Sequence, residues 1–152
     1  MDALDARQET KRDALAWIVL ATGALSIGNA LWMLVGPMHW YTDLPAAVPD
    51  TGPFNPHFVR DIGCAFLATG IALVWADRRP RDRVPLVSVA AIFLAAHAAL
   101  HAYDTLRGAL GHDHWLLDLP GVYFPGVAMP WIAWRWARED DGRDRPRRRG
   151  ET

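Results

Sequence analysis

The chain has 152 residues, a net charge of −1 and 51% hydrophobic residues, which is enough material for a single domain. Its single cysteine, Cys64, excludes an intramolecular disulfide and any cysteine-based zinc site. The charged residues are separated from long apolar runs, a distribution that excludes an ordinary soluble helical bundle and predicts a membrane protein.

The first predicted element is an uncharged stretch over residues 14–36. At about 1.5 Å of rise per residue, a helix of this length extends roughly 34 Å, and the hydrocarbon core of a bilayer is about 30 Å thick. The stretch is apolar on every face, exceeds the hydrophobic part of a signal peptide, and is not followed directly by a small-residue cleavage site. It is therefore predicted to be the first transmembrane span.

A proline-rich loop and a second span follow. The loop, residues 37–56, contains five prolines and several large apolar residues, which favours an ordered cap at the outer end of the helices over a flexible linker. Asn55 and Pro56 are suited to the N-cap and the first position of a helix. The second span is accordingly predicted over residues 58–76.

The third and fourth spans are predicted over residues 84–104 and 116–137. The loop between the second and third spans is short, so these two should be antiparallel neighbours. In the fourth span, Pro125 and Pro130 each remove a backbone hydrogen bond, so a kink is expected there. The Arg-rich tail over residues 139–152 is expected to be disordered.

The basic residues set the orientation. Three precede the first span, four lie between the second and third, and seven lie at or beyond the end of the fourth, which together are fourteen of the sixteen. The positive-inside rule places this side, with both termini, in the cytoplasm. The prediction is an all-α, up-down-up-down four-helix bundle over residues 1–138 in a bacterial inner membrane, with loops 37–57 and 104–118 facing the periplasm. Its Arg-rich side is expected to contact anionic lipids rather than nucleic acid.

Polar residues recur on one face of two spans. His97, His101 and Asp104 follow one another at intervals of four and three residues, so they share a face of the third span. His57 and Asp61 are four residues apart and share a face of the second span. Ionisable groups at membrane depth are costly, so they should face the interior of the bundle and pair there.

The depths of these residues agree. Counted from the cytoplasmic end, His97 and His101 lie about 20 and 26 Å up the third span, and Asp61 lies about 22 Å up the second. Asn29, the one amide of the first span, lies at about 22 Å as well. Three helices therefore bring polar side chains to one level.

The leading hypothesis is a metal site at the periplasmic face, for metal-dependent membrane chemistry or metal handling. Imidazoles and carboxylates suit zinc, iron or copper, and a three-ligand site with an open position is typical of catalysis or transport. The expected ligands are His97, His101, Asp61 and His57, and the expected supporting residues around them are Asp104, Asn29 and Arg60. Four residues lie in the second outer loop, from which they can close over the site: His112, Asp113, His114 and Asp118.

A haem variant of this site is disfavoured. Two axial histidines must face each other from different helices, and His57 lies too near the surface to pair with His97. The reaction itself is not predicted, so the chain is not assigned as an enzyme.

Two other functions are compatible with the same residues. The chain can be an accessory subunit of a larger membrane complex, in which the polar cluster only holds helices together. Small residues that allow close helix approach favour this reading: Gly63, Gly70, Ala91, Ala95, Ala98 and Ala102. The chain can also be a small proton-coupled carrier with Asp61 as a relay, and with four spans it would act as a dimer.

The segment Gly-Pro-Phe-Asn-Pro-His-Phe-Val-Arg-Asp-Ile-Gly, residues 52–63, resembles a segment of small bacterial inner-membrane proteins that have four transmembrane helices and no assigned function. The resemblance covers about a dozen residues, and the hydrophobic layout of the rest of the chain is similar. It implies the four-span topology and draws attention to His57, Arg60 and Asp61, but it implies no activity.

Overall fold

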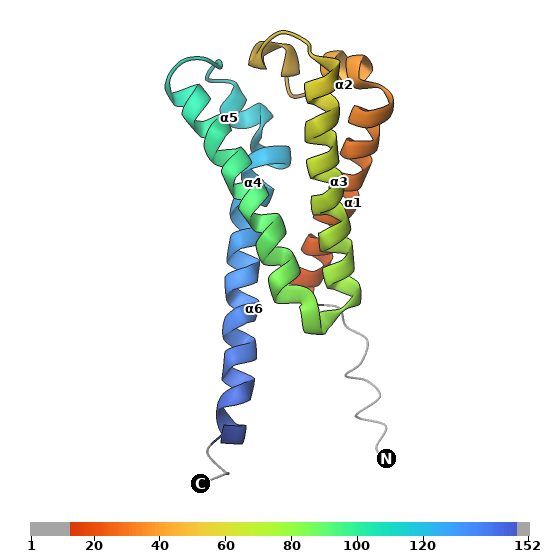
Figure 1. Cartoon of the computed structure of the whole chain (residues 1–152). Helices are drawn as coiled ribbons and strands as arrows, with labels where there is room; N and C mark the ends of the chain where they lie inside the picture. Colours follow the sequence, from red (N-terminus) through yellow and green to blue (C-terminus); the bar gives the residue numbers. More distant parts are fainter. Residues whose placement is uncertain (1–12, 149–152) are drawn as a thin grey trace.

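The structure, a computed structural model, describes the backbone of residues 13–148 and the side chains as far as Asp141, and this part of the chain is helical without strands (Figure 1). The long helices are α1 (Ala14–Val35), α3 (Pro56–Arg78), α4 (Arg83–Leu106) and α6 (Phe124–Arg148). The predicted all-α class is confirmed.

Among the described residues, three helical segments are long and apolar enough to cross a membrane: Ala14–Val35, Pro56–Arg78 and Pro80–Leu106. They correspond to the first three predicted spans, and the third includes the short helix η3 (Pro80–Asp82) in front of α4. Such helices indicate an integral membrane protein.

The N-terminus of α3 has the predicted local structure. Asn55 is the N-cap residue, and its side chain accepts hydrogen bonds from the backbone N–H groups of His57 and Phe58, each at 3.1 Å. Pro56 occupies the first helical position, where its missing N–H costs nothing.

The region of the fourth predicted span is interrupted. It consists of α5 (His114–Leu117), a π-helical turn η4 (Leu119–Tyr123) and α6. Within η4 the carbonyl of Asp118 accepts the N–H groups of both Val122 and Tyr123, at 2.8 and 3.1 Å. This turn, with one extra residue, precedes Pro125, and α6 continues through Pro125 and Pro130, so the kink expected at these prolines stays a prediction.

Helix α6 continues to Arg148, so the disorder expected from residue 139 onward is not observed as far as that residue, and residues 149–152 lie outside the described part. Arg83, which begins α4, explains part of this order. Its guanidinium lies 3.8 Å from Glu139 and 3.4 Å from Asp140, and stacks 4.6 Å from the ring centre of Trp136.

The long helices pack in two pairs, α1 with α3 and α4 with α6, and the pairs diverge toward the end that carries α2 and α5 (Figure 1). Glycines allow the close approach within each pair. A Cβ atom on Gly70 would lie 2.8 Å from the carbonyl oxygen of Gly23, and one on Gly126 would lie 2.5 Å from the Cβ of Ala98. Substitution at these glycines would push the paired helices apart.

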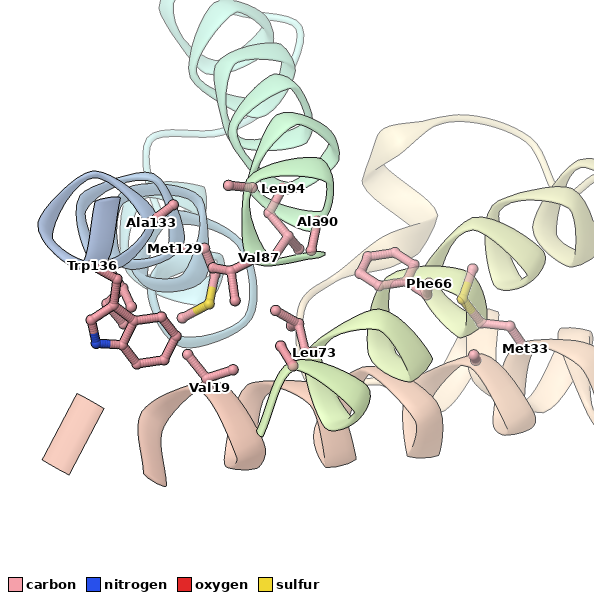
Figure 2. Packing of buried hydrophobic residues seen from close by; sticks show 14 of the residues in the cluster. Val19, Met33, Phe66, Leu73, Val87, Ala90, Leu94, Met129, Ala133 and Trp136 are labelled. Atoms are coloured by element: carbon pink, nitrogen blue, oxygen red, sulfur yellow. The ribbon is translucent and has the colours of Figure 1, made fainter. Parts of the chain in front are cut away.

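A hydrophobic core joins the two pairs where they converge (Figure 2). Leu73 of α3, Val87 of α4 and Met129 of α6 are fully buried in it, together with Val19 of α1. The same cluster also continues between α1 and α3 as far as Met33 and Val59, toward the diverging end.

That diverging end carries an ordered cap, as predicted for loop 37–56. It includes α2 (Pro37–Asp43) and the 3-10 helix η2 (Val48–Thr51). The Trp40 Nε1–H group donates to Asn29 Oδ1 at 2.7 Å and fixes α2 to α1, while the Tyr41 hydroxyl donates to the carbonyl of Gly52 at 2.7 Å.

Candidate functional site

A buried carboxylate shared by two imidazoles lies at the diverging end, between α4 and α5. Asp118 Oδ2 is 2.8 Å from His101 Nδ1 and 3.3 Å from His114 Nδ1. Asp118 is 2% exposed and His114 is 0% exposed, whereas His101 is partly buried. We refer to these three residues as the Asp118 centre.

Local structure positions each member. His114 and Asp118 are four residues apart, and the Asp118 N–H donates to the His114 carbonyl at 3.0 Å, which closes one helical turn and brings the two side chains together. His101 lies on the last turns of α4, where its carbonyl accepts the hydroxyl of the buried Thr105 at 2.9 Å. The π-helical turn begins directly after Asp118, so the carboxylate lies at the break between α5 and α6.

The shared acceptor, Asp118 Oδ2, determines which tautomer of each of the two histidines can bind it. An ionised carboxylate only accepts hydrogen bonds, so each imidazole donates to Asp118 through Nδ1–H and keeps Nε2 for another partner. A carboxylate in this position also fixes the orientation of the ring. The centre therefore has two oriented imidazoles with their Nε2 atoms available for a proton or another cation.

The centre continues in both directions. On the inner side, the His101 ring lies edge-on to His97 with the ring centres 4.6 Å apart, and His97 in turn contacts Phe66 and Phe93. On the outer side, His114 Nε2 is 3.6 Å from Asp50 Oδ2 of η2, and the Asp50 side chain is 59% exposed. A row of titratable groups thus leads from the surface to the interface between α3 and α4.

The residues predicted as metal ligands lie in two pairs. His97 and His101 are in ring contact on α4, as described above. His57 Nε2 and Asp61 Oδ2 are 3.4 Å apart on α3, and their side chains are 88% and 59% exposed. The structure gives no contact between the two pairs.

The predicted supporting residues have other partners. Asp104 pairs with Arg107 at 2.8 Å, and this hydrogen bond raises the pKa of Arg107 above its usual value. Asn29 binds Trp40 and contacts the Met33 sulfur at 3.5 Å, and the Arg60 Nε–H donates to the carbonyl of Leu34 at 3.2 Å. Each of the three is engaged in fixing local structure.

Within the described residues, no group of three or more His, Cys, Asp or Glu side chains is arranged to hold a metal ion. Metal binding by His97, His101, Asp61 and His57 consequently stays a prediction. The predicted ligand set and the Asp118 centre share only His101, while His114 and Asp118 are among the loop residues predicted to lie over that site.

Two members of the centre had signals in the sequence. Asp118 is the one acidic residue inside the otherwise apolar fourth span, and His114 precedes it by four residues, a helical interval. The interval alone does not show that both side chains meet His101, because His101 lies on a different helical segment. Asp50 had no signal, since it lies in a proline-rich loop far from its partners in the sequence.

No protein-family model, no curated protein and no solved structure matches this chain.

Proposed function

We propose that the chain is a four-span protein of a bacterial inner membrane with both termini in the cytoplasm. The distribution of basic residues supports this orientation. The start of α1, the loop between α3 and α4, and the end of α6 all lie at one end of the molecule, as an even number of crossings requires (Figure 1). In this orientation the Asp118 centre faces the periplasm and the arginines contact anionic lipid.

The function that the geometry supports best is proton uptake and release at the Asp118 centre, as part of a proton-coupled membrane process such as that of a small carrier. The observation that carries this proposal is the single buried carboxylate oxygen shared by His101 and His114. Imidazole is the side chain whose charge changes most readily near neutral pH, and two imidazoles on one carboxylate bind protons as a coupled unit.

The row of groups supplies a route for the proton. Asp50 is exposed, His114 and Asp118 are buried, and His101 leads to His97. Beyond His97 the ring contacts are with Phe66 and Phe93, which carry no proton. The route therefore ends inside the molecule, which favours a proton-binding centre over a continuous proton channel.

The accessory-subunit alternative loses part of its basis. It rested on small residues available to a partner, but Gly63 and Gly70 of α3 pack against α1, and Ala98 of α4 packs against Gly126 of α6. These small residues serve helix contacts within the chain.

An NMR titration tests the proposal. In protein with ¹⁵N-labelled histidine, purified in detergent, we expect His101 and His114 to titrate as a coupled pair and Asp118→Asn to uncouple them. The uncoupling follows because the asparagine amide is neutral, so it no longer supplies the negative charge that both imidazoles share. The matched control is Asp61→Asn, which should change His57 alone.

The same variants should be compared after reconstitution into liposomes. After acidification of the external medium, we expect the wild-type protein and the Asp61→Asn variant to take up protons. The Asp118→Asn variant should take up fewer. Independent titration of His101 and His114 in the wild-type protein would overturn the proposal.

A further inference from the structure

A buried nitrogen without a hydrogen-bond partner lies at the outer end of the Asp118 centre. His114 Nε2 is fully buried and has no hydrogen bond to any described residue. The nearest acidic oxygen is Asp50 Oδ2 at 3.6 Å, which is beyond hydrogen-bond distance. Buried polar atoms are nearly always paired, so this nitrogen requires a physical explanation.

The tautomer of His114 determines what its Nε2 atom can bind. With His114 Nδ1–H donating to Asp118, the neutral ring presents a lone pair at Nε2. That lone pair and the Asp50 Oδ2 atom lie 3.6 Å apart, and two acceptors cannot hydrogen-bond to each other. Such a pair is stabilised only when a cation lies between its members.

We propose that a divalent transition metal ion of the zinc type binds between His114 Nε2 and Asp50 Oδ2. Zinc lies about 2.0–2.1 Å from imidazole nitrogen and about 2.0–2.2 Å from carboxylate oxygen, so two of its ligands at a tetrahedral angle are about 3.4 Å apart. The observed 3.6 Å is close to that separation. Asp118 completes the arrangement in which a carboxylate orients a metal-binding histidine.

The loop that carries Asp50 is built to hold it at this position. Ala47 has a φ of 47°, in the left-handed region that residues with a side chain rarely adopt, and its carbonyl accepts the Asp50 N–H at 3.0 Å. On the other side, the Tyr41 hydroxyl holds the carbonyl of Gly52. A backbone conformation of this kind persists only where the surrounding structure enforces it, and such conformations cluster at ligand sites.

The metal site extends the proposed function and rests on it in one respect, the passage of a proton through His114 Nε2. A metal ion on His114 Nε2 would occupy the position through which a proton passes from Asp50 to the Asp118 centre. Zinc should therefore act as an inhibitor of proton uptake at this centre, with its remaining coordination positions open to water.

Calorimetric titration of the detergent-purified protein with Zn²⁺ at one fixed pH tests the site. We expect one equivalent to bind, Asp50→Asn to weaken binding at least about tenfold, and Asp118→Asn to weaken it about 10- to 100-fold through loss of ring orientation. Asp50 is exposed, so its substitution should leave the fold intact. His114→Gln provides a second variant, and in ¹⁵N spectra of the wild-type protein the His114 Nε2 resonance should shift on metal addition.

Two controls exclude the exposed His–Asp pairs. Asp43→Asn alters the pair with His39, and Asp61→Asn alters the pair with His57 and removes a ligand of the site predicted from the sequence. Both should bind zinc like the wild-type protein. Unchanged affinity in Asp50→Asn, or loss of binding in Asp61→Asn, would overturn the inference without affecting the coupled titration of His101 and His114. If zinc binds but His101 and His114 titrate independently, the metal site stands and only the proposed proton-binding centre is overturned.

Discussion

At the scale of single residues, one buried acid, Asp118, connects the polar side chains of the diverging end. Asp118 accepts from His101 on α4 and from His114 on α5, so one carboxylate oxygen joins two helical segments. A buried charge is tolerated only when it is paired, and here both available partners are imidazoles. The centre therefore stabilises the fold and keeps two nitrogen atoms free at the same time.

Asp118→Asn should for this reason lower the free energy of unfolding by about 1–3 kcal/mol, because two imidazoles exchange a charged acceptor for a neutral amide in a buried position. The measurement is thermal or denaturant unfolding in detergent. Asp104→Asn is the matched control, because Asp104 pairs with the exposed Arg107 and such surface pairs contribute little. Equal midpoints for the two variants would argue against a stabilising role of the shared carboxylate.

At the scale of helices, packing depends on a few glycines. The backbones of α1 and α3 approach closely at Gly23 and Gly70, and α4 and α6 approach closely at Ala98 and Gly126. Helices in a membrane gain no hydrophobic free energy from association, since lipid is as apolar as leucine, so close van der Waals contact has to hold them together.

Gly70→Ala should accordingly destabilise the protein by about 1–3 kcal/mol, because a new Cβ would lie 2.8 Å from the Gly23 carbonyl oxygen and 2.9 Å from the Ile27 nitrogen. Backbone atoms cannot move aside as a side chain can. Gly28→Ala is the control on α1, where no atom lies within 4 Å of the added Cβ. That change should be neutral or stabilising by up to about 1 kcal/mol, and unfolding in the same detergent measures both.

At the scale of the whole molecule, two helix pairs join at one end and separate at the other (Figure 1). The part of the apolar core that both pairs share lies at the converging end, and the Asp118 centre and the cap lie at the diverging end. This segregation places the polar chemistry on one side of the proposed membrane.

Cysteine labelling of intact cells tests the proposed topology in a Cys64→Ala background, where no other thiol is present. Cysteines at Thr51 and Asp113 should react with a membrane-impermeant maleimide added outside. Cysteines at Arg81 and Arg138 should react only after permeabilisation. Reaction of the Arg138 position from outside would mean that α6 does not cross the membrane, and would contradict a four-span topology.

The sequence by itself determined the helical class, the three apolar helices and local details such as the Asn55 cap. These depend on run length, composition and neighbouring residues, which are properties of consecutive positions. The shared face of His97 and His101 was likewise correct, since their rings are in contact along α4. The partners of these residues were not determined in this way.

Only the tertiary structure decided which polar groups meet. Periodicity gives the face of a helix, but the π-helical turn after Asp118 changes the phase of the fourth segment, and the proline-rich loop carries Asp50 across to His114. Asp61 is likewise exposed on α3, although counting residues predicts the same depth for it as for His97. Depth is fixed by counting residues, whereas contact depends on the course of loops and on helix crossing, which no local interval encodes.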